Sequence, residues 1–122
     1  MMKKVLIVDD SAFNRTFLSA ILRKKKLIVD FAENGEEAVK KFSEYNPDVV
    51  FIDYVMPMKS GVDALREMKQ LNPHFVGIML TSISSAEDVQ KAKEAGANGY
   101  ILKPYQPEKI FEVLKKFRII EE

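Results

Sequence analysis

Five short apolar runs recur along the chain, and an amphipathic stretch with helical spacing follows each of them. The runs span residues 5–8, 27–31, 49–52, 76–80 and 100–102. Strands that alternate with helices in this way form parallel pairs, because each helix carries the chain back across the sheet. The pattern therefore predicts one parallel sheet with helices on both of its faces.

The polarity of the runs predicts their order in the sheet. Residues 5–8, 49–52 and 76–80 are nearly all apolar, as central parallel strands covered on both faces usually are. The run at 27–31 contains Asp30, which suits an edge strand. The expected strand order is therefore 2-1-3-4-5, the order of a doubly wound, flavodoxin-like α/β fold with five strand–helix units.

Capping residues and apolar stripes predict the helices. Ser11, Asn34 and Ser85 stand at N-cap positions, and Asn46-Pro47 and Asn72-Pro73 end helices. The apolar positions at helical spacing are Phe13, Phe17 and Ile21 in the first helix, with Leu18 and Leu22 beside them, and Val62, Leu65, Met68 and Leu71 in one stripe of the third. The fourth helix, over residues 86–95, offers the sheet only Ala86, Val89, Ala92 and Ala95. We therefore expect it to be weakly anchored.

Length and composition exclude several classes of protein. The 122 residues suit one domain, residues 1–122, and the absence of cysteine excludes a disulfide framework, a thiolate metal site and cysteine catalysis. With 19 Lys and Arg against 18 Asp and Glu, bulk charge does not favour nucleic-acid binding. No apolar run approaches the roughly 20 residues of a membrane helix, and the N-terminus lacks the long apolar region of a signal peptide. We therefore expect a cytoplasmic protein without membrane contact.

Polar side chains gather after four of the five predicted strands. They are Asp9 and Asp10, then Asp53, Thr81 and Lys103. In this strand order, ligands bind at the carboxyl ends of the strands where the winding reverses, between the first and third strands. We therefore expect these five side chains to form one site.

The types of these side chains indicate phosphoryl transfer to an aspartate. Three carboxylates at one edge repel each other unless positive charge lies among them. Mg²⁺ supplies that charge, and it typically takes one or two carboxylates, waters and a phosphate oxygen. Lys103 adds a fixed positive charge and Thr81 a hydroxyl. A carboxylate nucleophile, a metal, a cation and a hydroxyl are the components that such a transfer uses.

The spacing of these residues matches a known signalling module. The matching segments are Asp9-Asp10-Ser11, then Asp53-Tyr54-Val55-Met56-Pro57 with Gly61, then Thr81-Ser82, and finally Tyr100 followed by Lys103-Pro104. Each segment is common alone, but the set spans the whole chain in order. The chain resembles a response-regulator receiver domain of two-component signalling, of the stand-alone CheY-like kind.

The resemblance implies a phosphoacceptor that catalyses only its own phosphorylation and dephosphorylation. Asp53 would take the phosphoryl group from a phosphohistidine of a sensor histidine kinase. Asp10, Asp53 and the backbone carbonyl of Val55 would hold Mg²⁺, and Asp9 would act mainly through metal-bound water.

The resemblance also implies a switch. Lys103 would pair with the phosphoryl group, and Thr81 would bond another of its oxygens and draw its loop inward. Tyr100 would then swing from exposed to buried and change the surface of the fourth helix, fifth strand and fifth helix. The Lys103-Pro104 peptide bond is expected to be cis.

The partners are inferred from the same resemblance. The kinase is expected to dock near Phe13, Asn14 and Arg15, at the start of the first helix. A downstream protein of unknown identity would bind the switched surface, and the unphosphorylated protein is expected to be a monomer.

Other functions remain open at this point. A phosphorelay intermediate would pass the phosphoryl group from Asp53 to a second histidine protein. An aspartate-nucleophile phosphatase of the haloacid-dehalogenase kind would need a second Asp where Val55 stands. A flavodoxin-like electron carrier would need a phosphate-binding loop where Asp9-Asp10-Ser11 stands.

Overall fold

In the computed structural model, which describes residues 2–121, five strands alternate with five helices. The strands are β1 (Lys4–Val8), β2 (Ile28–Ala32), β3 (Val49–Ile52), β4 (Val76–Thr81) and β5 (Gly99–Leu102). The helices are α1 (Ala12–Arg23), α2 (Gly35–Tyr45), α3 (Gly61–Leu71), α4 (Ala86–Glu94) and α5 (Pro107–Lys116). All strand pairs are parallel and their order is β2-β1-β3-β4-β5, which confirms the predicted fold class.

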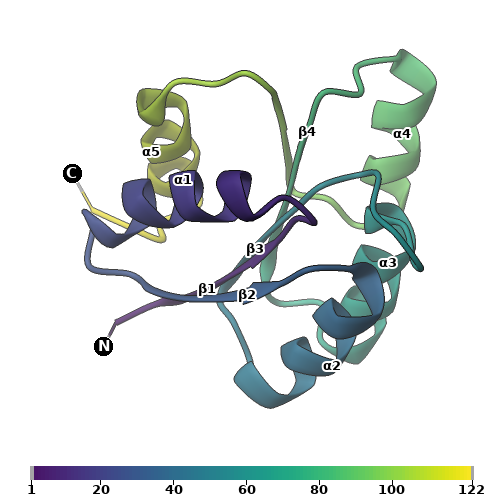
Figure 1. Ribbon diagram of the computed structural model, residues 1–122, viewed down its shortest axis with the longest axis horizontal. Coiled ribbons are helices and arrows are strands. Elements are labelled where there is room, and N and C mark those ends of the chain that lie inside the picture. The colour runs from purple at the N-terminus through teal and green to yellow at the C-terminus, as the bar shows by residue number, and fades with distance from the viewer. Residues whose placement is uncertain (1, 122) are drawn as a thin grey trace.

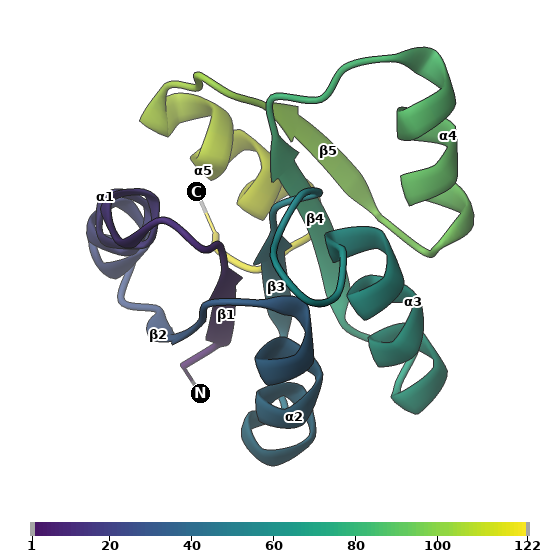
Figure 2. The same ribbon diagram turned by 45° about the vertical axis from the view of Figure 1, so that its right-hand side comes forward.

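Helices cover both faces of the sheet, with α1 and α5 on one side and α2, α3 and α4 on the other (Figures 1 and 2). Because side chains alternate along a strand, β1 contributes to both layers. Val5 and Ile7 pack with the α1 and α5 side chains, and Leu6 and Val8 pack with those of α2 and α3. The central position of β1 explains why residues 5–8 are apolar throughout.

The predicted N-caps are confirmed. The side chains of Ser11, Asn34 and Ser85 each accept a hydrogen bond from the backbone N–H three residues further on. Ser11 has the greatest consequence for the site, since it begins α1 only three residues after β1 ends. The first turn of α1 is thereby held beside the carboxyl end of that strand.

Three side chains at the apolar positions named from the sequence are exposed in the structure. Phe13 is 76% exposed and Phe17 is 43% exposed, while Leu18, Ile21 and Leu22 form the buried face of α1. The two phenylalanines border a hollow whose lining also includes Ile7, Phe51 and Leu80 of the strands. Leu71, the last residue of α3, is 58% exposed, whereas Met68 in the same turn is fully buried.

Helix α4 buries less apolar surface than its neighbours, as expected. Ala92 is its one buried residue, with Ala95 buried just beyond its end. Ala86 was expected to face inward but is exposed. Within residues 2–121, no helix combines the length and the apolar character needed to cross a membrane.

Candidate functional site

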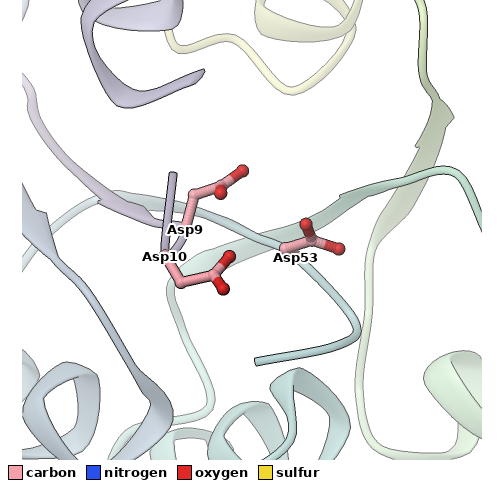
Figure 3. Close-up of side chains that lie close together, drawn as sticks. All are labelled: Asp9, Asp10 and Asp53. Atoms are coloured by element: carbon pink, nitrogen blue, oxygen red, sulfur yellow. The ribbon is translucent and has the colours of Figure 1, made fainter. Parts of the chain in front are cut away.

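Three carboxylates meet at the carboxyl end of the sheet (Figure 3). Asp9 and Asp10 follow β1, and Asp53 follows the adjacent strand β3. One oxygen from each carboxylate lies within 4.8 Å of the others. Asp9 is buried, Asp53 is half-buried and Asp10 is exposed, so the cluster opens to solvent on the Asp10 side. The predicted acidic cluster is therefore assembled by the fold.

The backbone around Asp53 is held from two sides. The N–H of Asp53 donates to the carbonyl of Val8 (3.0 Å), and the N–H of Gly61 donates to the carbonyl of Tyr54 (2.8 Å). A Cβ at Gly61 would overlap the carbonyl oxygen of Asp53, so only glycine permits this close approach. The start of α3 thereby fixes the position from which the Asp53 side chain projects.

Lys103, which follows β5, bridges two of the carboxylates. Its ammonium group donates to Oδ2 of Asp9 at 2.9 Å and to Oδ2 of Asp53 at 3.0 Å. Burial alone would lower the pKa of Lys103, but the hydrogen bonds to Asp9 and Asp53 raise it above its ordinary value. Lys103 therefore carries its positive charge at neutral pH, and the Lys103–Pro104 peptide bond is cis, as expected.

The first turn of α1 holds Asp9. The backbone N–H of Ser11 donates to its Oδ1 at 2.9 Å, and the Asn14 amide approaches its Oδ2 at 3.4 Å. The guanidinium of Arg15 donates to the backbone carbonyl of Asp9 at 2.7 Å. The contacts of Asn14 and Arg15 with Asp9 were not predicted. The position of both residues just after the N-cap Ser11 did indicate that they lie near the end of β1. Phe13, named with them as a kinase contact, is exposed beside this turn and makes no hydrogen bond to Asp9 through its apolar side chain.

Thr81 and Tyr100 lie on the two strands at the far side of the sheet. Thr81 is buried at the end of β4, and its carbonyl accepts from the N–H of Lys103 at 2.9 Å. The N–H of Ile83 approaches the Thr81 hydroxyl at 3.4 Å, and the Tyr100 hydroxyl donates to the Ile83 carbonyl at 2.6 Å. Tyr100 is half-buried, so its ring is already turned inward against the loop that follows β4.

A contact that no sequence pattern predicted joins Tyr54, the residue after Asp53, to α4. The hydroxyl of Tyr54 donates to Oδ1 of Asp88 at 3.2 Å, and the Ser85 hydroxyl donates to Oδ2 of the same carboxylate at 2.7 Å. Burial, and then the Asp88 carboxylate, raise the pKa of Tyr54. Tyr54 and Asp88 are 34 residues apart, and no local pattern indicates that they meet.

A hollow of about 470 Å³ adjoins the carboxylates. It is lined by strand, α1 and loop residues: Ile7, Val8, Asp9, Phe13, Asn14, Phe17, Leu18, Phe51, Ile52, Asp53, Leu80, Ser82, Lys103, Pro104 and Tyr105. Phe17 stands between Phe13, at a ring-centre distance of 6.3 Å, and Tyr105, at 5.9 Å. Burial, reinforced by the Asp9 carboxylate, raises the pKa of Tyr105 to about 12.

The donor set of the cluster fits Mg²⁺. All three side chains offer carboxylate oxygens, which are the ligands that this hard cation takes in proteins. Among the residues that the structure describes, no side chain pairs with the Asp10 carboxylate, which leaves its oxygens available to an ion. Asp53 has one oxygen committed to Lys103 and the other open. Asp10 and Asp53 are thus the residues best able to bind a metal directly.

Comparison with known proteins shows the family of the chain. Residues 5–115 match the family model described as the response regulator receiver domain. The chain is 46% identical over 114 residues to the chemotaxis protein CheY of Halobacterium salinarum, covering 93% of this chain and 95% of that protein.

Solved structures show the same relationship. A CheY-like receiver domain protein from Methanospirillum hungatei superposes with a TM-score of 0.92 at 28% identity, covering 96% of this chain and 94% of the other. A CheX-CheY-BeF3-Mg²⁺ complex from Borrelia burgdorferi superposes with a TM-score of 0.89 at 32% identity, covering 94% of this chain and 89% of the other. The chain belongs to the response regulator receiver domain family of two-component signalling and is CheY-like.

Proposed function

We propose that this protein is a Mg²⁺-dependent phosphoacceptor whose nucleophile is Asp53. A carboxylate oxygen of Asp53 attacks the phosphorus of a kinase phosphohistidine, the phosphorus–nitrogen bond breaks, and the imidazole leaves with the bonding electrons. The observation that carries the proposal is the shared contact of Lys103 with Asp9 and Asp53 inside a three-carboxylate cluster. This arrangement puts fixed positive charge where the negative phosphoryl oxygens arrive.

The surroundings of the carboxylates support Asp53, and not Asp9, as the nucleophile. Asp9 is buried and accepts from Ser11, Lys103 and the more distant Asn14, so both of its oxygens are occupied. Asp53 is half-buried and, within residues 2–121, accepts a side-chain hydrogen bond from Lys103 on one oxygen only. Its second oxygen is therefore available for attack on phosphorus.

The metal would be held by Asp10, Asp53 and the carbonyl of Val55, with Asp9 acting through water. When bound, Mg²⁺ neutralises charge on the phosphoryl oxygens during transfer. Asp9 keeps Lys103 in place through its 2.9 Å contact, and Lys103 stabilises the transferred group. Thr81 then bonds a phosphoryl oxygen at the end of β4 and shifts the loop that Ile83 and Tyr100 share.

The consequence of phosphorylation is a change on the face formed by α4, β5 and α5. The loop after β4 leads directly into α4, and Tyr100 on β5 bonds the Ile83 carbonyl in that loop. A downstream protein would bind this face. The Borrelia burgdorferi CheY in the comparison is complexed with CheX, which supports a protein partner of this general kind.

The kinase would approach from the side of α1. Phe13 is exposed beside the carboxylates, and Asn14 and Arg15 form the same helical turn. Phe13 would make the direct contact, since Asn14 and Arg15 are engaged with Asp9. A phosphatase function is disfavoured because Val55, and no acid, stands two residues after the nucleophile.

Incubation with acetyl phosphate and MgCl₂, followed by intact mass measurement, tests the proposal. The wild type is expected to gain the mass of one phosphoryl group, which is lost on treatment with hydroxylamine, as an acyl phosphate is. Asp53→Asn is expected to gain none, and Asp63→Asn, an exposed carboxylate paired with Arg66, serves as the matched control. Equal labelling of Asp53→Asn and the wild type would contradict the proposal.

A further inference from the structure

We propose that the hollow beside the carboxylates binds the leaving group of the phosphoryl donor and favours an aromatic one. Aromatic acyl phosphates are then better small-molecule donors to this protein than aliphatic acyl phosphates. The proposal rests on the proposed function, because it assigns a substrate class to the same nucleophile.

The hollow is continuous with the reacting groups. Asp53 and Lys103 line it together with the rings of Phe17 and Tyr105, in a volume of about 470 Å³. Pockets of about 300–1,000 Å³ with mostly apolar walls and a few converging polar groups are typical small-molecule sites. A donor whose phosphorus lies at Asp53 therefore has an apolar space beside it that can take a ring.

The wall of the hollow is an aromatic cluster. The rings of Phe13 and Phe17 are nearly parallel, at 8°, and Phe17 meets Tyr105 at 56°. Phe13 is 76% exposed and Phe17 is 43% exposed, so this part of the wall is open to a ligand from solvent. With a pKa of about 12, Tyr105 stays neutral at pH 7 and adds no negative charge to an acidic site.

The transfer balances without a further reactant. An oxygen of Asp53 bonds to the phosphorus of benzoyl phosphate, the bond between phosphorus and the acyl oxygen breaks, and benzoate leaves with the electron pair. Benzoate and acetate are carboxylates of similar basicity, so the donors differ mainly in the ring. Burial of about 60 Å² of that ring at ~25 cal/mol per Å² corresponds to roughly a tenfold preference.

The first experiment compares the rates at which benzoyl phosphate and acetyl phosphate label the protein in the presence of MgCl₂. We expect benzoyl phosphate to be about tenfold faster with the wild type, and the ratio to fall to about twofold in Phe17→Ala, which removes the centre of the wall. Phe111→Ala is the matched control. Phe111 lies on α5 with its ring 4.7 Å from the Lys25 ammonium, and it does not line the hollow.

The second experiment measures binding without transfer, using benzylphosphonate and ethylphosphonate with Mg²⁺ in a nuclear magnetic resonance titration. We expect about tenfold tighter binding of benzylphosphonate, again reduced in Phe17→Ala. Equal affinities, or a preference that Phe17→Ala leaves unchanged, would overturn the proposal. If neither acyl phosphate labels Asp53 but benzylphosphonate still binds more tightly, the hollow is supported and the proposed phosphoacceptor function is contradicted.

Discussion

At the scale of single residues, the surroundings of each side chain determine what it can do. Asp9 and Asp53 have the same chemistry and follow neighbouring strands. Asp9 is buried under the first turn of α1 and bonded on both oxygens, whereas Asp53 keeps one oxygen open. Asp9 is therefore suited to hold Lys103, and Asp53 is suited to react.

Val55 is expected to prolong the lifetime of the phosphorylated protein. Its side chain lies two residues after Asp53 and is 63% exposed, and it cannot form a hydrogen bond to a water that approaches the phosphoryl group. Val55→Asn should speed hydrolysis of the phosphorylated Asp53 by roughly tenfold, which is less than the acceleration that a side chain acting as a general base provides. Decay of the phosphorylated mass after removal of acetyl phosphate measures the rate.

Met58 provides the control for that measurement. It is exposed in the same loop, and Met58→Asn adds the same amide group five residues after Asp53 in place of two. An unchanged lifetime in Val55→Asn, or an equal change in both variants, would contradict a specific role of Val55.

Tyr105 is expected to make the folded state sensitive to alkaline pH. Burial raises the pKa of Tyr105 from 10.0 to about 12, so the folded state holds the phenol proton more tightly than the unfolded chain. The contribution of Tyr105 to the free energy of unfolding is complete below pH 10 and is lost as pH rises towards 12. Urea unfolding at pH values below and above 10 measures the free energy of unfolding, which should fall less in Tyr105→Phe than in the wild type as the pH rises. If both proteins lose the same free energy of unfolding, groups other than Tyr105 cause the sensitivity to alkaline pH.

At the scale of elements, α4 depends on polar contacts more than its neighbours do. It buries only Ala92 within its length, whereas α1 buries four residues. Its first turn is joined to the end of β3 by the hydrogen bond from Tyr54 to Asp88. The backbone of Tyr54 is itself fixed by Gly61. A rigid strand end thus holds the start of a weakly packed helix.

Removal of the Tyr54 hydroxyl should loosen α4 without affecting the rest of the fold. Amides of α4 are expected to exchange faster than those of α1 in the wild type, and about threefold to tenfold faster still in Tyr54→Phe. Hydrogen exchange resolved by residue measures both effects.

Tyr45→Phe is the matched control for Tyr54→Phe, since it removes a hydroxyl that donates to the Ile28 carbonyl, away from α4. If α4 proves as protected as α1, the helix is not weakly anchored. If Tyr54→Phe leaves α4 exchange unchanged, the hydrogen bond does not hold the helix.

Local patterns predicted the elements well because they encode local physics. The strand over residues 49–52 and the caps at Ser11, Asn34 and Ser85 are confirmed, since apolar runs and capping side chains act within a few residues. The exposure of Phe13 and Phe17 was not predicted, because four-residue spacing alone does not show how deeply each side chain of a helix is buried. Contacts such as Tyr54 with Asp88 depend on how distant loops meet.

At the scale of the whole molecule, the fold concentrates charge that is nearly balanced along the chain. The formal net charge is +1, yet three carboxylates and Lys103 converge at one edge of the sheet. Residues from positions 9 to 103 reach this edge only because the strands run parallel in the observed order. The local excess of negative charge that remains after Lys103 is what a divalent cation would neutralise.

Calorimetric titration with MgCl₂ tests this claim most directly. The wild type is expected to bind one Mg²⁺ saturably at millimolar concentration. Asp10→Asn should lose that binding because Asp10 offers the most accessible oxygens of the cluster. Asp63→Asn should bind as the wild type does. No uptake by the wild type at millimolar concentration, or equal uptake by Asp10→Asn, would show that the three carboxylates do not form a Mg²⁺ site.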